Sequence, residues 1–417
     1  FYMLSGMVDT LMLSSVSDQA VGAVGTANTY IGVFIIMFGV ISSGMVAVMS
    51  QNIGAGRPGI AYQARQLGLV FNALTGILMS VVLAVFSGGI LRAVSIAPAL
   101  LESAETYLKI VGGASFLNAL IPIFSSYLRV FGYTKHSLIG TVVGNVINII
   151  LNSVFLFVFH WGVMGVATAT VISKVVNLII VAAMGAVLIK AKQSPERAQP
   201  RRILAQIVKI GFPSVFETAL YNVAMTFIVC FMNHMDGMNV TARSYAMQIA
   251  NFSYCVGAAL AQANAIMTGW RIGAKKYEEC DRGTRKAVIY GLVTATCFSV
   301  TFAITGRFIV HIFTNDIQMI ELVVKLLVVD IFLEFGRVTN LVYGQALKTS
   351  GDAIFPVIMG AIFMYLFAVG GTYFLGIHMG LLAVGAYIAM AGDECARAVG
   401  MVLRWKSGKW KSKSLVE

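Results

Sequence analysis

Long apolar runs alternate with short polar segments along the whole chain. Runs such as 27–48 and 68–86 match the about 20 apolar residues that a helix needs to cross a bilayer. The connections between the runs are rich in Gly, Pro or charged residues, as loops between spans are. The pattern predicts twelve helices, at residues 1–14, 26–50, 67–91, 106–128, 137–160, 163–189, 205–233, 242–269, 287–311, 320–347, 354–377 and 380–404.

Two of these predicted helices have unusual features. The first, 1–14, is too short to cross a bilayer, so we expect the beginning of this helix to be missing from the chain. The fourth, 106–128, contains Pro122, which removes a backbone hydrogen-bond donor and predicts a kink at that point.

Composition places the chain in a membrane. Apolar side chains make up 58% of the 417 residues and charged side chains 12%. A water-soluble domain of this size does not sustain that balance, so we predict an all-α membrane protein. The five cysteines are far apart and no histidine stands at ligand spacing, so we expect neither a disulfide framework nor a zinc site. The net charge of +12 does not indicate nucleic acid as a partner, because the basic residues lie in short loops.

The distribution of Lys and Arg predicts the orientation of the chain. Most of the 30 basic residues lie in the connections after even-numbered helices and in the C-terminal tail. The connections after odd-numbered helices hold only Arg92, Arg243 and Arg307. Basic residues collect in short cytoplasmic loops. We therefore predict a multi-pass protein of the cell (inner) membrane with both termini in the cytoplasm.

Three short matches recur in the same order and indicate an internal repeat. The second copy of each match lies 218 or 219 residues after the first. The matched segments are 53–55 with 272–274, 128–132 with 347–351, and 162–166 with 380–384. Each segment follows the equivalent helix of its half. We therefore predict two pseudo-symmetric lobes of six helices, related by an axis along the membrane normal.

The repeat defines the predicted domains. They are an N lobe at 1–190, a lobe linker at 191–204, a C lobe at 205–404 and a basic cytoplasmic tail at 405–417. Two similar lobes around a cleft suit alternating access, in which the cleft opens to each side of the membrane in turn.

Several stretches are similar to one transporter family: Val8-Asp9-Thr10, Gln51 to Gly56, Leu128-Arg129, Asn145 to Asn152, Gly162 to Ser173, and Gly211-Phe212-Pro213 with Glu217. Because they occur in order and in both halves, the chain resembles the multidrug and toxic compound extrusion (MATE) transporters over nearly its whole length. The resemblance implies twelve helices in two lobes. It also implies antiport, in which small organic and often cationic compounds leave in exchange for H⁺ or Na⁺, with no cofactor.

Polar residues of the predicted N lobe are candidates for binding the coupling ion. Asp9 lies within the first helix with no basic residue within a turn, and a charged side chain in the bilayer costs about 2.5 kcal/mol or more unless it pairs or works. Asn148 and Asn152 share a face of the fifth helix. Their carbonyl oxygens can ligate a cation or form a hydrogen bond with an acid. Alternatively, the two side chains hold neighbouring helices together. The resemblance makes Asp9 the coupling acid, with H⁺ or Na⁺ as its ion, and adds Thr170 as a hydroxyl ligand. Many relatives have a second acid where this chain has Asn152, which weakens the case for a two-carboxylate Na⁺ site.

In the predicted C lobe, Glu217 follows Pro213 by four residues in the seventh helix. A membrane carboxyl beside a helix break can face the cleft and change its protonation state. We expect Glu217 either to take part in coupling and substrate binding or to form a structural ion pair.

The tenth and twelfth predicted helices carry a candidate polar network, in which acids and arginines three residues apart can pair along a helix face. Its members are Glu334, Arg337, Asn340, Asp393, Glu394 and Arg397. One interpretation is that ion pairs hold the two helices together. The other is that the C lobe binds the coupling cation, in which case we expect Glu217 or an unpaired acid such as Asp393 to be the ligand. By resemblance, Arg337 stands where several relatives have a lone Asp, and an arginine does not bind a cation.

Two other transport functions stay open on the sequence. A lipid-linked oligosaccharide flippase of the same superfamily would need a cationic cleft, and a narrow-substrate metabolite exporter would share the fold. We do not expect an enzyme, because the chain has no HExxH, GxSxG or P-loop motif. The expected partners are small organic substrates and the lipid bilayer, and the expected state is a monomer.

Overall fold

A computed structural model describes residues 12–13, 17–93, 96–190, 194–235, 237–311 and 314–416. Asp9 and nearly all of the predicted helix 1–14 lie outside these residues. The described chain is helical and contains no strand. It divides into two compact units, which we call unit 1 (Phe1–Met49 and Arg57–Gly211) and unit 2 (Ser50–Gly56 and Phe212–Glu417).

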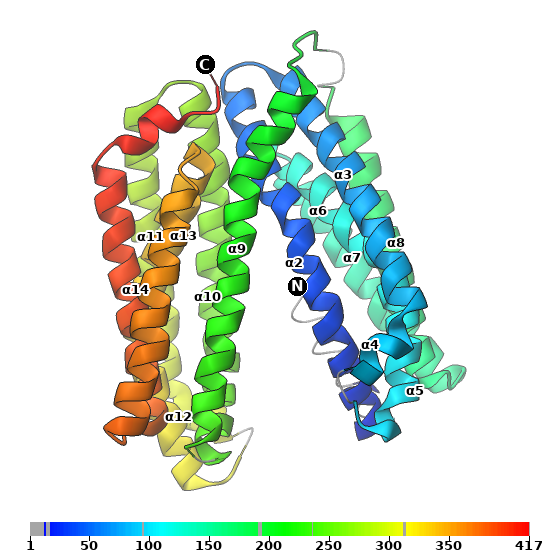
Figure 1. The fold of residues 1–417 in the computed structure, drawn as a ribbon, viewed down its shortest axis with the longest axis vertical. Coiled ribbons are helices and arrows are strands. Elements are labelled where there is room, and N and C mark those ends of the chain that lie inside the picture. Colours follow the sequence, from blue (N-terminus) through cyan, green and yellow to red (C-terminus); the bar gives the residue numbers. More distant parts are fainter. Residues whose placement is uncertain are drawn as a thin grey trace. The chain divides into compact units, whose positions relative to one another are not determined.

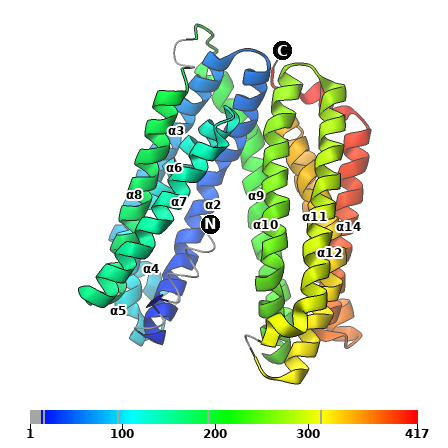
Figure 2. The ribbon, with the colours of Figure 1, turned by 180° about the vertical axis from the view of Figure 1, so that it is seen from behind.

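Unit 1 is built from helices that pack around an apolar core (Figures 1 and 2). Its elements are α2 (Asp18–Gly54) as far as Met49, α3 (Pro58–Val85), α4 (Ser87–Ala93), α5 (Pro98–Tyr107), η1 (Leu108–Gly112), α6 (Ser115–Val130), α7 (Thr134–Ser153), η2 (Val154–Val158), α8 (Gly162–Leu188) and the first part of α9 (Pro200–Asn233).

Unit 2 is organised around α12, which packs against α10, α11 and α14 (Figure 2). The elements of unit 2 are the last turn of α2, the rest of α9, α10 (Gly237–Gly273), α11 (Tyr277–His311), α12 (Ile317–Ser350), α13 (Ile354–Phe363), η4 (Met364–Val369), η5 (Thr372–His378), α14 (Leu382–Lys406) and η6 (Lys409–Lys413). Asp316 caps the start of α12, since its carboxylate accepts hydrogen bonds from the amides of Gln318 and Met319. Gly351 ends the helix in the left-handed conformation, with φ at 100°.

Helices begin earlier than their apolar runs predict. Pro58 opens α3 at a position where the missing amide proton costs nothing. Tyr277 opens α11, whose first turn carries Glu278 and Glu279, and acidic side chains are favourable at a helix N-terminus. These polar ends are helical because backbone hydrogen bonding continues beyond the apolar segment, which the hydrophobic pattern alone does not reveal.

The fourth predicted helix is bent at a different place from the one predicted. It consists of α5 with η1, followed by α6, and the two parts meet at 41° between Gly112 and Ser115. Pro122 lies inside α6, which continues as a helix on both sides of it. The bend therefore falls at a pair of glycines after a π-helical turn, and both features are known causes of kinks.

Three helices of unit 2 differ in composition from the rest. Among the described residues, seven helices are long and apolar enough to cross a bilayer, and the bent pair makes an eighth candidate. Helices α10, α12 and α14, with 37, 34 and 25 residues, are long enough but more polar. These three pack against one another, and polar side chains such as Ser253, Asp330 and Asp393 are buried between the helices of unit 2.

The internal repeat is visible in the backbone. Left-handed residues recur at the spacing of the sequence matches, at Gly56 and Lys275, Gly132 and Gly351, and Gly162 and Gly380. The π-helical turns η2 and η5 precede the last of these pairs in the same way. Each half of the chain thus ends equivalent helices with the same turn.

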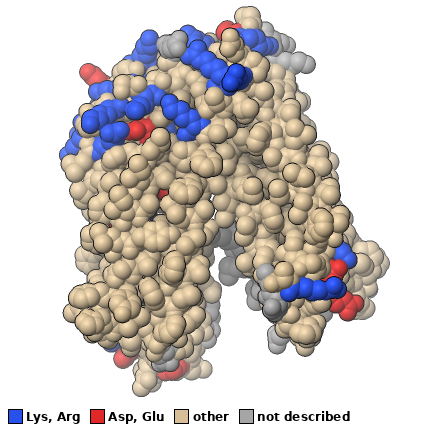
Figure 3. Space-filling view, viewed as in Figure 1, with Lys and Arg blue, Asp and Glu red and all other residues tan. Residues whose placement is uncertain are grey.

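The C-terminal tail, residues 407–416, packs against unit 2. Trp410 is 1% exposed and stacks on Trp405, with 4.2 Å between ring centroids. The buried side chain of Gln51 donates to the carbonyl of Thr349 at 2.6 Å and accepts from the amide of Leu415 at 2.8 Å. Exposed Lys and Arg gather at this end of unit 2 (Figure 3), including Lys275, Lys276, Arg285, Lys286, Lys406, Lys409, Lys411 and Lys413.

Candidate functional site

Unit 2 contains a cavity of about 560 Å³ between α9, α10, α12 and α14. The α12 residues that line it run from Asp330 to Lys348, which is about 27 Å along the axis at 1.5 Å per residue. Its wall combines charged, amide, aromatic and methionine side chains, among them Glu217, Tyr221, Gln248, Asn251, Tyr254, Asp330, Arg337, Asn340, Gln345, Lys348, Met364, Tyr387, Met390, Glu394 and Arg397.

The helical period explains why α12 presents its charges to the cavity. Arg337 follows Asp330 by seven residues, and Lys348 follows Arg337 by eleven, so the three lie on one face at 3.6 residues per turn. On α14, Glu394 and Arg397 are three apart and also share a face. Gly336 lets α12 and α14 approach closely, since a Cβ there would meet the backbone of Glu394 and Cys395.

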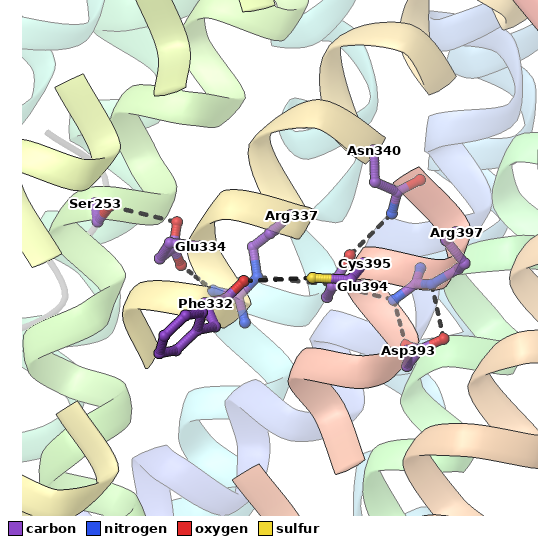
Figure 4. Close-up of polar contacts among 9 residues, drawn as sticks. All are labelled: Ser253, Phe332, Glu334, Arg337, Asn340, Asp393, Glu394, Cys395 and Arg397. Atoms are coloured by element: carbon purple, nitrogen blue, oxygen red, sulfur yellow. Dashed lines mark hydrogen bonds and ion pairs between the residues drawn. The ribbon is translucent and has the colours of Figure 1, made fainter. Parts of the chain in front are cut away.

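The six residues of the candidate network form one connected cluster, which we call the ion-pair network (Figure 4). Arg337 pairs with Glu334 on its own helix, and its Nε lies 3.7 Å from Glu394 Oε1 on α14. Asn340 Nδ2 donates to Glu394 Oε2 at 2.9 Å. Arg397 Nη2 lies 3.0 Å from Glu394 Oε1. Glu394 therefore links α14 to α12 through two partners on α12, Arg337 and Asn340.

Asp393 is not an unpaired acid, contrary to expectation. Its carboxylate accepts from Arg397 Nε at 2.9 Å and from Nη2 at 2.5 Å. This bidentate pair is possible because the two residues are four apart on α14, so the planar guanidinium faces both oxygens. The spacing of three residues suggested Glu394 as the partner of Arg397, and Arg397 in fact contacts both acids.

Glu217 is also paired. Its Oε2 lies 2.5 Å from Lys348 Nζ, and the two side chains are 23% and 13% exposed. Lys348 lies in the last turn of α12, and its pairing with Glu217 was not predicted from the sequence. Its long side chain reaches Glu217 on α9, and both residues line the cavity.

Asp330, near the other end of the lining, is the functional candidate that sequence reasoning missed. It is 3% exposed and lines the cavity. It forms no ion pair or hydrogen bond with any residue that the structure describes. The spacing of seven residues to Arg337 is the signal that could have identified it.

The candidates of unit 1 lie on α7 and α8, which pack side by side. Asn148 and Asn152 are buried, and Asn152 Nδ2 donates to Asn148 Oδ1 at 3.4 Å. Thr170 donates its hydroxyl proton to the carbonyl of Val166 at 2.8 Å, within its own helix. Asp9 lies outside the described residues, so its distance to these three is not part of the structure.

The charged side chains that line the unit 2 cavity are not all paired. Each cation of the lining, namely Arg337, Arg397 and Lys348, contacts at least one carboxylate. The lining holds three carboxylates, Glu217, Asp330 and Glu394, and three cations. Glu334 and Asp393 do not line the cavity but also pair with Arg337 and Arg397, so Asp330 is the carboxylate of the lining that has no ion pair among the described residues. Such a site favours a cationic occupant over an anionic one. No three His, Cys, Asp or Glu side chains converge as metal ligands within the part of the chain that the structure describes.

Comparison with known proteins identifies the family. The MatE family model matches residues 1–154 and 213–374. An uncharacterized transporter of Bacillus subtilis, YisQ, is 32% identical over 99% of this chain and 92% of its own length. A probable multidrug resistance protein of Thermotoga maritima, NorM, is 26% identical over 99% of this chain and 90% of its own.

Solved structures give the same fold. A crystal structure of MATE in the straight conformation matches with a TM-score of 0.89 and 20% identity, over 98% of this chain and 93% of that one. The fold is therefore that of an all-α membrane protein with twelve transmembrane helices in two six-helix lobes. The chain belongs to the MatE family of transporters.

Proposed function

We propose that this protein is a secondary active efflux antiporter, which exports organic and often cationic compounds in exchange for H⁺ or Na⁺. The observation that carries the proposal is the unit 2 cavity, where aromatic and methionine side chains lie beside charged groups and every cation of the lining contacts a carboxylate. Adaptable apolar walls with a few fixed charges suit flat organic molecules of varied shape. The relatives named as multidrug resistance proteins support the same assignment.

The lipid-linked oligosaccharide flippase is less well supported. A pyrophosphate needs free cationic side chains, because each phosphate oxygen must regain the hydrogen bonds that it loses from water. Arg337 and Arg397 already contact carboxylates within the ion-pair network, and Lys348 contacts Glu217. An anionic headgroup would have to break these pairs.

In the mechanism that we propose, ion and substrate compete. Asp9 holds the coupling ion in the N lobe, and Asn148, Asn152 and Thr170 are further candidate ligands. Binding of the ion from outside weakens the affinity for substrate in the outward-open state, so each ion that enters releases substrate. Alternating access of the two lobes, with both termini in the cytoplasm of a cell-membrane monomer, completes the cycle.

The test is efflux of a fluorescent cationic dye from cells that express the full-length protein. If H⁺ is the coupling ion, we expect a protonophore to abolish the efflux. If Na⁺ is the coupling ion, we expect replacement of Na⁺ by choline to abolish it. Asp9→Asn should remove gradient-dependent efflux at unchanged expression. Glu321→Gln is the matched control, because Glu321 is exposed on α12.

Glu217→Gln separates the two roles of Glu217. If Glu217 takes part in coupling, the variant is folded and transports poorly. If the pair with Lys348 is only structural, the variant gives less folded protein, and the double variant with Lys348→Gln recovers it. Efflux that survives both Asp9→Asn and Glu217→Gln at wild-type rate would exclude both residues from coupling.

A further inference from the structure

Asp330 is the one acid of the cavity lining that has no partner among the described residues. Glu217 has Lys348, and Glu394 has Arg337, Arg397 and Asn340. Asp330 is 3% exposed, compared with 8% for Glu394. A buried ionised carboxylate without a counter-charge is strongly disfavoured, so either a proton or a cation must accompany it.

Arg337 does not serve as that cation. It is seven residues away along α12, about 10 Å along the axis. Its guanidinium is held by Glu334 on one side and approached by Glu394 on the other. Turning it toward Asp330 would break its pair with the buried carboxylate of Glu334, which has no other ion pair among the described residues, and loss of one member of a buried pair is costly.

The surroundings of Asp330 match an organic cation. Tyr387 of α14 is 2% exposed and lines the same cavity as Asp330. Tyr387, Leu333, Met364 and Met390 all line the cavity and belong to one apolar cluster of unit 2. A carboxylate at the edge of aromatic and thioether side chains offers charge to a cationic centre and apolar surface to the groups around it.

We propose that Asp330 binds the cationic group of the exported compound. The inference deepens the proposed function and rests on it, because it names the residue that selects charge within the same cavity. Asp330 suits this role better than Glu217, since Glu217 would first have to release Lys348. The ion-pair network is then a fixed wall of the site, and Asp330 is its charge-selective contact.

The test uses two probes of similar bulk, tetraphenylphosphonium, which is cationic, and triphenylphosphine oxide, which is neutral. Their binding to purified protein in detergent is measured for the wild type, Asp330→Asn, Asp330→Glu and the control Glu321→Gln. We expect Asp330→Asn to weaken tetraphenylphosphonium binding at least about ten-fold, as loss of a buried charge contact does. Triphenylphosphine oxide binding should not change, Asp330→Glu should retain most of the affinity, and Glu321→Gln should match the wild type.

Three results would overturn the inference. The first is that the wild type does not bind tetraphenylphosphonium. The second is that Asp330→Asn binds it as tightly as the wild type does. The third is that Asp330→Asn stays folded but loses affinity for both probes equally. Folding is followed separately by the melting temperature, which tetraphenylphosphonium should raise in the wild type and not in Asp330→Asn. Dye efflux tests the proposed function independently, so efflux by the wild type together with an unaffected Asp330→Asn would remove only the inference.

Discussion

Gly54 and Gly273 each lie against the backbone of the other's helix. A Cβ on Gly54 would meet the carbonyl of Trp270 on α10, and a Cβ on Gly273 would meet the carbonyl of Gln51 on α2. The two contacts are related by the repeat spacing of 219 residues. The end of α2 and the end of α10 therefore meet as equivalent partners.

This contact predicts that Gly273→Ala destabilises the protein. A backbone carbonyl cannot move aside as a flexible side chain can, so the two helix ends must separate, at a cost of about 1–3 kcal/mol. We expect a lower melting temperature in detergent and less folded protein. Gly392→Ala on α14 is the control, because a Cβ there meets no atom within 4 Å. Equal melting temperatures for the two variants would contradict the prediction.

Removing Arg397 should be more damaging than removing an exposed arginine. Arg397→Leu leaves Asp393 and Glu394 buried without their shared partner, and loss of one member of a buried pair costs about 3–5 kcal/mol. Arg285→Ala breaks an exposed pair with Asp281, which is worth about 0–1 kcal/mol. Melting temperatures of both variants measure the difference. The double variant Arg397→Leu with Asp393→Leu should recover part of the loss, and failure to recover any would argue against the pairing.

Reversing the charges of Glu217 and Lys348 should be tolerated better than either single change. Glu217→Lys puts two ammonium groups together at a separation of a few ångströms, and Lys348→Glu does the same for two carboxylates. The swap restores opposite charges across α9 and α12. The wild type, the two single variants and the double variant form a double-mutant cycle, in which expression and melting temperature are measured. Additive losses would show that the two side chains do not interact.

Trp410→Ala should loosen the C-terminal tail. The substitution removes a buried indole that stacks on Trp405 and donates to its carbonyl at 2.9 Å, so we expect a loss of about 3–5 kcal/mol in the contacts of this region. Hydrogen exchange should increase at residues 409–416 and at the end of α14. Lys413→Ala, an exposed change in the same segment, should leave exchange unchanged. Protection that persists in Trp410→Ala would mean that Gln51 alone holds the tail.

The sequence predicted the fold well because its main signals are local. Apolar length locates each span, and the glycines at 132 and 351 mark equivalent helix ends. The site was harder to predict. The spacing of Asp330, Arg337 and Lys348 indicates a shared face, but only packing shows that Lys348 reaches Glu217 and that Arg397 holds Asp393. Hydrophobic pattern carries no information on which of several nearby acids an arginine selects.

The contacts of Gln51 also bear on how the protein is made. Its side chain bonds to the amide of Leu415, which is 364 residues later in the chain. At roughly 5–20 residues per second, synthesis of the intervening segment takes about 20–70 s. During that interval α2 has been synthesised while one hydrogen-bond partner of its buried Gln51 does not yet exist. A membrane insertase or chaperone that covers the end of α2 would therefore matter most before residue 415 is translated.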